Sequence, residues 1–280
     1  MNLPRQGHGP DLIALVARSP VHVAAHDRQA WLDLFTDNAT VEDPVGSPAV
    51  HKQDGSLAAF WDTFIAPNQV RFEIILDCVQ GDEVLRQVII HTEMGHGVRI
   101  QVPAYLLYKT ESAGGARRLR SLAAYWTLKH SAKQARGLGA RGLVPMGGLV
   151  ARMVRKLGPT WLYAYMASQW RGVGMGGVRA AEAFARAVST RDEAALLALF
   201  ADGVGEVSLG DVRTPPAAFL AQLPPGSQLS LEQPIAAGWV TGCRFRIDGP
   251  APAQGLALFE TDPERRRLTR ARFFVAAPPS

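Results

Sequence analysis

An internal repeat constrains the fold of this chain more than any other feature of its sequence. Residues 26–37 align without a gap with residues 191–202, and Asp27, Leu34, Phe35 and Asp37 are among the positions that recur identically 165 residues later. In both copies an apolar helical pattern precedes this segment, and alternating strand-like runs follow it. A fixed self-similarity of this kind marks a repeated structural unit, and 280 residues suit two domains of ordinary size. The economical explanation is duplication of one α+β domain.

The first copy has the pattern of three helices combined with an antiparallel sheet. Asp27 is placed to cap the second helix, and Pro44 is placed to end the first short strand. Helices packed on a curved sheet form a cone whose open mouth can hold a ligand. The predicted helices are residues 11–25, 27–36 and 56–65, and the predicted strands are residues 39–43 and about 70–79, 83–93, 98–110 and 117–128.

The charge is distributed unevenly along the chain. No acidic residue lies between Glu111 and Glu182, whereas the same stretch carries twelve Lys or Arg residues. Because the net charge is +5, the rest of the chain sums to −7 (5 − 12). A basic block in an otherwise acidic protein suggests an anionic partner surface. The predicted organisation is a first domain at 1–130, a basic, glycine-rich helical segment at 131–178, and a second domain at 179–280.

The basic segment has three interpretations, which the sequence leaves open. It is a helical arm packed on the domains with its charges solvated, or it lies on an anionic membrane, or it binds nucleic acid. Membrane binding would place aromatic side chains at the lipid interface. No recognised nucleic-acid module is present, so nucleic acid is not predicted as a partner. The aromatic residues concerned are Trp161, Tyr163, Tyr165 and Trp170.

Composition restricts where the protein is expected to be located and which cofactors it is expected to bind. About half of the residues are apolar and a fifth are charged, no apolar run is long enough to span a bilayer, and the first residues lack the order of a signal peptide. A cytoplasmic protein is expected, peripheral at the inner membrane face if the basic segment binds lipid. Cys78 and Cys243 fit no ligand spacing and are expected as buried side chains in a reducing compartment. No metal site and no cofactor are predicted.

The segment from Leu34 to Ser47 carries a motif for chemistry. It contains Leu-Phe-Thr-Asp followed by Glu42, Asp43 and Pro44 in the run Glu-Asp-Pro-Val-Gly. This segment resembles the corresponding one of bacterial steroid Δ5-3-ketoisomerases, in the NTF2-like (SnoaL-like) superfamily. The resemblance covers residues 11–128 in the order and spacing of elements. It implies tandem NTF2-like cone domains of the α+β class.

The resemblance implies that Asp43 is the catalytic base. A β,γ-unsaturated ketone isomerises when a carboxylate removes a proton next to the carbonyl and returns it at the far carbon of the dienolate. Glu42 and Asp43 point to opposite faces if the strand runs through both, so only one can face the cavity. The resemblance selects Asp43. From the residues alone, a simple Asp-Pro turn with an Asx hydrogen bond is the alternative.

The resemblance also implies positions for the oxyanion donors and the cavity wall. The family's tyrosine position falls at Ser19, and its acid position falls at Tyr105. Tyr105 is therefore the predicted donor, with Ser19 or a water as a weaker second donor. The alternative for Tyr105 is a core tyrosine bonded to a backbone carbonyl. The aromatic wall, for which plain core packing is the alternative, is predicted from Phe60, Trp61, Tyr125 and Trp126.

The second copy has lost the predicted base, because Ser208 stands at the position of Asp43. Residues 179–280 are therefore expected to be a non-catalytic partner that makes the chain a covalent pseudo-dimer, and further self-association stays open. The predicted function is a cofactor-independent isomerase acting on a hydrophobic, steroid-like polycyclic ketone. The alternatives are a non-catalytic steroid- or lipid-binding protein at a membrane, and SnoaL-like cyclase, dehydratase or epoxide-hydrolase chemistry.

Overall fold

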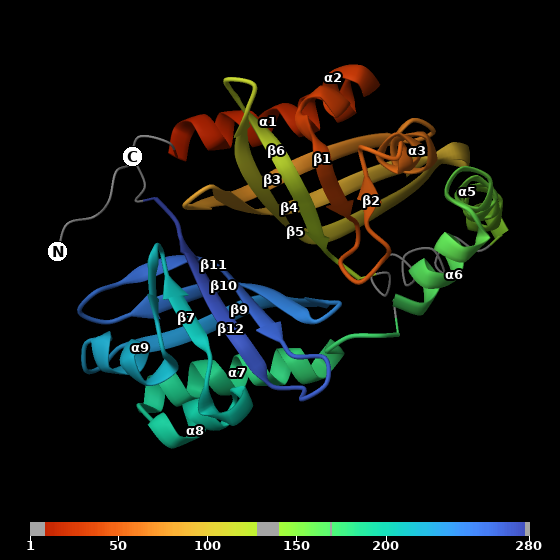
Figure 1. The fold of residues 1–280 in the computed structure, drawn as a ribbon. Helices are drawn as coiled ribbons and strands as arrows, with labels where there is room; N and C mark the ends of the chain where they lie inside the picture. Colours follow the sequence, from red (N-terminus) through yellow and green to blue (C-terminus); the bar gives the residue numbers. More distant parts are fainter. Residues whose placement is uncertain (1–8, 128–139, 169, 278–280) are drawn as a thin grey trace.

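The computed structural model describes residues 9–127, 140–168 and 170–277, and these residues form two six-stranded sheets, one from each copy of the repeat (Figure 1). The strand orders are β2-β1-β6-β5-β4-β3 and β8-β7-β12-β11-β10-β9. In each sheet one central pair is parallel, β1 with β6 and β12 with β7, and the other pairs are antiparallel. The predicted class, two tandem α+β cone domains joined by a helical segment, is confirmed.

The elements of the two copies correspond one to one. In the first copy they are α1 (Gly9–Ala24), α2 (Arg28–Asp33), β1 (Phe35–Glu42), β2 (Val50–His51), α3 (Ser56–Phe60) with a π-helical turn (Trp61–Ile65), β3 (Gln69–Gln80), β4 (Glu83–Met94), β5 (Val98–Ala113) and β6 (Ala116–Tyr125). In the second they are α7 (Gly174–Thr190), α8 (Glu193–Ala198), β7 (Glu206–Leu209), β8 (Val212–Thr214), α9 (Pro216–Gln222), β9 (Gln228–Ala237), β10 (Val240–Asp248), β11 (Ala253–Thr261) and β12 (Leu268–Val275). Between them lie α5 (Ala140–Leu157) and α6 (Pro159–Ser168).

The repeated aspartate is a helix cap in both domains. The Asp27 carboxylate accepts a hydrogen bond from the backbone N–H of Ala30 at 3.0 Å, and Asp192 accepts one from Ala195 at 2.9 Å. The residue before each cap has a left-handed backbone, with φ of 56° at His26 and 55° at Arg191. The repeat in the sequence is therefore a repeat of backbone geometry.

The second helix is shorter than predicted. Residues 27–36 were expected to be helical, but α2 ends at Asp33 and β1 begins at Phe35. The Leu34 carbonyl accepts a hydrogen bond from the backbone N–H of Leu119 on β6 at 2.8 Å, and Phe35 pairs with the same residue. Pairing with the sheet outweighs the local helical pattern at this point.

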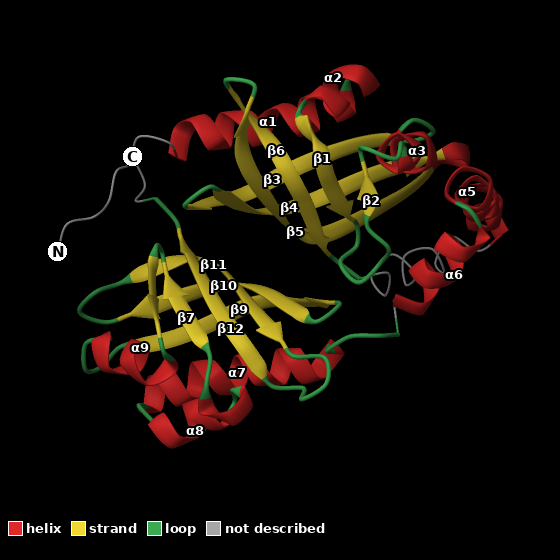
Figure 2. Cartoon of the chain, viewed as in Figure 1, coloured by secondary structure: helices red, strands yellow, loops and turns green. Residues whose placement is uncertain are grey.

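The two sheets pack against each other, with helices on their outer sides (Figure 2). The Tyr105 hydroxyl donates a hydrogen bond to the Gln233 carbonyl at 2.9 Å, and an ion pair joins Glu83 to Arg272. Burying apolar side chains of both sheets stabilises this contact by roughly 25 cal/mol per Å². The apolar interface is formed by Cys78, Leu85, Tyr105, Leu107 and Tyr125 from the first domain and Ala237, Leu256, Leu258 and Phe274 from the second.

The cores of the two cones differ. In the second domain six phenylalanine rings fill the space between helices and sheet, with ring centroids 5.0–6.3 Å apart. Such spacing is typical of aromatic packing. These rings are Phe184, Phe200, Phe219, Phe245, Phe259 and Phe273. The first cone instead leaves a cavity, described below.

The helical segment between the domains packs on the first cone. The Lys156 ammonium lies 3.3 Å from the Asp62 carboxylate, and the Arg152 guanidinium donates to the Thr63 carbonyl at 3.3 Å. Leu157 and Trp161 contact the core of the first domain. For residues 140–168 this agrees with the interpretation of a packed helical arm. The basic residues between positions 129 and 136 lie outside the described residues. Among the helices that are described, none is long and apolar enough to cross a membrane.

Two adjacent glycines on α7 test how this helix packs on the second sheet. A Cβ at Gly177 would lie 2.4 Å from Thr241 Oγ1, whereas a Cβ at Gly176 would meet nothing within 4 Å. We expect Gly177→Ala to destabilise the protein by about 1–3 kcal/mol through overpacking. Gly176→Ala should stabilise it by up to about 1 kcal/mol, because alanine favours helix. Urea unfolding of both variants measures the difference; equal midpoints would contradict the packing described.

Candidate functional site

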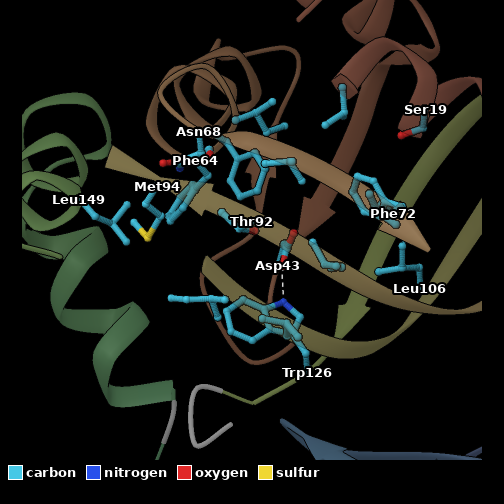
Figure 3. Close-up of a pocket in the computed structure, with 18 of the residues that line it drawn as sticks. Ser19, Asp43, Phe64, Asn68, Phe72, Thr92, Met94, Leu106, Trp126 and Leu149 are labelled. Atoms are coloured by element: carbon cyan, nitrogen blue, oxygen red, sulfur yellow. Dashed lines mark hydrogen bonds between the residues drawn. The ribbon is translucent and has the colours of Figure 1, made fainter. Parts of the chain in front are cut away.

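The first cone encloses an apolar cavity of about 200 Å³, and Asp43 lies on its wall directly after β1 (Figure 3). In Figure 3 Ser19 lies toward one end of the cavity, Leu149 and Met94 lie toward the other, and Asp43 lies between them. The cavity is lined by Ser19, Val23, Trp31, Asp43, Phe60, Phe64, Ile65, Asn68, Val70, Phe72, Ile90, Thr92, Met94, Ile100, Val102, Leu106, Tyr108, Leu122, Trp126, Met146, Leu149 and Tyr165. Asp43 is the one carboxylate among these residues.

The environment of Asp43 makes its carboxyl a weak acid. Burial among apolar side chains raises the pKa of Asp43 to about 6, although a hydrogen bond from Trp126 opposes the rise. The Trp126 indole N–H donates to Asp43 Oδ1 at 2.5 Å. A carboxylate with this pKa is ionised near neutral pH and is more basic than an exposed aspartate. It can therefore remove a weakly acidic proton from a bound molecule.

The backbone after Asp43 is held by hydrogen bonds on both sides. The Val45 N–H donates to the Ala124 carbonyl at 2.8 Å, and the Ser47 hydroxyl donates to the Pro44 carbonyl at 2.6 Å. The neighbouring carboxylate of Glu42 accepts a hydrogen bond from the Gly46 N–H at 2.7 Å and does not line the cavity. The structure thus brings Asp43, and not Glu42, to the cavity.

A junction of three glycines joins this loop to the second domain. A Cβ at Gly46 would lie 3.2 Å from Gly238 Cα, and a Cβ at Gly172 would lie 2.3 Å from the Gly238 carbonyl oxygen. All three residues have positive φ, from 52° to 139°. The turn between β9 and β10 therefore supports the loop that follows Asp43.

Hydroxyl groups gather away from Asp43 at the Ser19 end of the cavity. The Trp31 indole N–H donates to Ser19 Oγ at 3.0 Å, and Ser19 shares a hydrogen bond with the Tyr108 hydroxyl. Behind Tyr108 the buried Arg86 lies 5.9 Å from the ring centroid and forms a two-pronged contact with Asp77, at 2.6 and 2.8 Å. Burial raises the pKa of Tyr108, so this phenol stays protonated and can donate a hydrogen bond to a bound oxygen.

The structure separates the predicted site residues into two groups. Ser19, Asp43, Phe60 and Trp126 all line the cavity. Trp61 does not: it is buried behind the wall, with its ring centroid 5.3 Å from that of Trp31.

The prediction that Tyr105 and Tyr125 face the cavity is wrong. Both lie in the apolar interface between the two sheets, where the Tyr105 hydroxyl is bonded to the Gln233 carbonyl. Successive side chains of a strand point to opposite faces, so the neighbouring Leu106 and Tyr108 line the cavity instead. A shift of one residue along a strand therefore moves the predicted side chain to the opposite face of the sheet.

Sequence reasoning missed the part of the wall that comes from the helical segment. Met146 and Leu149 of α5 and Tyr165 of α6 line the cavity. The Tyr165 ring stacks on Trp161 at 5.2 Å, and burial together with the nearby Asp43 carboxylate raises the pKa of its hydroxyl. We call α5 and α6, residues 140–168, the helical cap. The signal available in the sequence was the apolar, aromatic character of a segment that was expected to be basic and solvated.

The described residues contain no group of three or more His, Cys, Asp or Glu side chains arranged to hold a metal ion. Cys78 and Cys243 are both buried and free, as expected.

The first domain matches a known protein family. Residues 16–127 match the model of the SnoaL-like domain family. The first domain is a SnoaL-like domain of the NTF2-like superfamily. A comparison with curated proteins gave no match.

Similar solved structures each cover the equivalent of one domain. A Δ5-3-ketosteroid isomerase from a Mycobacterium species is 27% identical, with a TM-score of 0.39, over 42% of this chain and 95% of that chain. A Mycobacterium tuberculosis protein in complex with estradiol-17β-hemisuccinate is 26% identical, with the same TM-score and the same coverage. The epoxide hydrolase/cyclase-like enzyme SalBIII, of salinomycin pyran ring formation, is 19% identical with a TM-score of 0.38, over 44% of this chain and 95% of that chain.

Neutralising Asp43 should stabilise the protein at neutral pH. The pKa of Asp43 is about 6 in the folded protein and about 3.9 in the unfolded chain. Folding is therefore favoured by protonation of Asp43, and this contribution to stability is complete below about pH 4 and is lost as the pH rises through 6. Asparagine does not ionise, so the variant does not lose stability over this pH range. Asp43→Asn should therefore melt at a higher temperature than wild type at pH 7.5, by up to about 3 kcal/mol of stability, and the gain should shrink toward pH 4.

The measurement is thermal unfolding followed by circular dichroism at a series of pH values. Asp37→Asn is the matched control, because it removes a fully exposed carboxylate from the same strand. Melting curves of Asp43→Asn that run parallel to wild type at every pH would contradict a raised pKa.

Proposed function

We propose that the protein is a cofactor-independent isomerase that moves a proton within a hydrophobic, steroid-like polycyclic ketone, with Asp43 as the base. The observation that supports this proposal is a single carboxylate, with a pKa of about 6, on the wall of an apolar and aromatic cavity. The match of residues 16–127 to the SnoaL-like family is consistent with it. A flat apolar substrate would be held by aromatic faces of this wall.

The reaction would proceed in two proton transfers. Asp43 takes the proton from the carbon between the ketone and the double bond, and the electron pair moves onto the ketone oxygen as a dienolate. The protonated Asp43 then returns the proton to the far carbon of the dienolate, so that the double bond becomes conjugated and the carboxylate is regenerated. No further reactant is consumed.

The Tyr108 hydroxyl is proposed as the donor to the dienolate oxygen, in place of Tyr105. Tyr108 lines the cavity, and its hydrogen-bond partner Ser19 is itself held by the indole N–H of Trp31. A donor held in place before the reaction stabilises developing charge more effectively than mobile water. The buried Arg86 behind the Tyr108 ring favours negative charge on this side.

The test is addition of a Δ5-3-ketosteroid, with formation of the conjugated enone followed by its absorbance. Asp43→Asn should lower kcat by about 10²–10⁴-fold, the range expected for removal of a general base. The wild-type kcat/KM should rise with pH and level off above about 6, because the base must be ionised. In Trp126→Phe the midpoint should move to higher pH, because the hydrogen bond that lowers the pKa is lost.

Matched variants separate the roles in this assay. Glu42→Gln changes the adjacent carboxylate outside the cavity and should keep the wild-type rate and pH midpoint. Tyr108→Phe should lower kcat by about a hundredfold. Equal background rates of wild type and Asp43→Asn would sink the isomerase proposal.

A non-catalytic steroid- or lipid-binding protein is the second candidate. It is favoured by one observation: the Ser19 and Tyr108 hydroxyls bond to each other, so only one of their two O–H groups is left to donate to a bound oxygen. Tight binding of the steroid, measured by quenching of tryptophan fluorescence in a protein without isomerase activity, would support this candidate. SnoaL-like cyclase or dehydratase chemistry would use the same base on a different substrate, and a panel of such substrates distinguishes it.

A further inference from the structure

The helical cap has an outer face opposite the one that closes the cavity. On α5, Leu149 faces the cavity and Met153 is buried, whereas Val144, Val150 and Val154 are exposed. At 100° per residue the three valines fall within an arc of about 120°. A helix on the surface of a globular domain ordinarily presents polar residues on this side. Instead, α5 is apolar on both its inner and outer sides.

The outer side of α6 continues this apolar character with aromatic residues. Tyr163 and Met166 are three residues apart, and Trp170 follows in a turn just beyond the helix end, seven residues after Tyr163. The spacing of three puts Tyr163 and Met166 on one side of α6. Tyr163 is 72% exposed and Trp170 is 86% exposed. We call six exposed residues, five on the two helices and one in the turn after α6, the outer apolar face: Val144, Val150, Val154, Tyr163, Met166 and Trp170.

The charged residues of the segment that carries this face are basic. Arg155 and Arg171 lie next to the face in the chain and are exposed, and the exposed Lys156 is paired with Asp62 of the first domain. No acidic residue occurs between Glu111 and Glu182. Exposed Trp and Tyr side chains with aliphatic neighbours and flanking cations are the combination that binds at the surface of an anionic bilayer. Basic residues near such a surface are attracted by its negative potential.

The same charges disfavour a second copy of the chain as the occupant. In a symmetric dimer the face would pack on itself, and each Arg155 and Arg171 would approach the partner's cations. Like charges held close together repel each other and lower affinity. An anionic lipid surface matches both the apolar and the charged parts of the face, and a second copy matches only the apolar part.

We propose that the outer apolar face of the helical cap docks on an anionic lipid bilayer. The inner face of the same two helices closes the cavity through Met146, Leu149 and Tyr165. Docking therefore brings the covered mouth of the cavity to the membrane, where apolar molecules dissolve. Delivery of a ligand from the bilayer to Asp43 rests on the proposed function; docking itself does not.

Sedimentation of the full chain with lipid vesicles tests the docking. One set of vesicles contains phosphatidylcholine alone, and the other contains equal parts of phosphatidylcholine and phosphatidylglycerol. We expect wild type to sediment with the anionic vesicles and not with the neutral ones. Arg171→Gln should weaken partition about fivefold. The double variant Tyr163→Ser/Trp170→Ser should weaken it at least as much, because it removes both exposed aromatic anchors.

Controls come from the second domain. Val204→Ser removes a valine that is 74% exposed, and Arg213→Gln removes an exposed cation, both far from the cap in the sequence. These variants should sediment like wild type. All substituted side chains are exposed, so each variant is expected to fold.

Three results would overturn the proposal. The first is no sedimentation of wild type with anionic vesicles, and the second is equal partition of the cap and control variants. The third is a wild-type dimer in analytical ultracentrifugation that Tyr163→Ser/Trp170→Ser converts to monomer without any vesicle binding. The vesicle assay contains no ketone and the isomerase assay contains no lipid, so each proposal fails independently of the other.

Discussion

The central strands of the first sheet have two buried faces, and the rest of the structure depends on this constraint. On β5, Tyr105 and Leu107 pack against the second domain, and Leu106 and Tyr108 line the cavity. Every side chain of this stretch therefore has a place fixed by the strand register. The second domain supports the cavity wall from behind, and an apolar cavity can persist because the sheet that bounds it cannot easily bend inward.

The interiors of the two cones differ: one is filled by side chains and the other contains a cavity. In the second domain the interior is filled by phenylalanine rings. The prediction that Ser208 stands at the position of Asp43 is wrong by one residue: the strand pairing matches Ser208 with Glu42, and Leu209 with Asp43. Ser208 is buried and accepts a hydrogen bond from Gln80 of the first domain at 3.2 Å, whereas Leu209 packs against the core of the second cone. In the first domain Asp43 faces an open interior. This contrast fits the proposal that one copy carries the site and the other serves as its support.

The sequence was informative where local chemistry decides the structure. The repeat predicted two similar domains and the order of their main elements, although the two-residue strand β2 was not predicted, and the shared Asp27 and Asp192 cap equivalent helices. The run through Asp43 and Pro44 predicted which carboxylate faces the cavity. Ser19, Phe60 and Trp126 also line it.

The predictions were wrong where contacts between segments distant in the sequence determine the local structure. The helix predicted through Phe35 ended early because β6 pairs with that residue. The resemblance implies a donor at Tyr105, but a shift of one residue along a strand moves a side chain to the opposite face, and Tyr105 lies in the interface between the two sheets. The helical cap is formed by a tertiary contact between α5 and the turn after α3, for which the sequence offers no spacing rule. The apolar, aromatic character of residues 161–166 was the signal that the sequence offered.

The central claim is that Asp43 is an unusually basic carboxylate in an apolar cavity. The most direct measurement is the titration of its ¹³Cγ chemical shift by NMR in aspartate-labelled protein, with the resonance assigned by its loss in Asp43→Asn. The structure predicts a midpoint near pH 6. A midpoint near 4, the value of an exposed aspartate, would contradict the account.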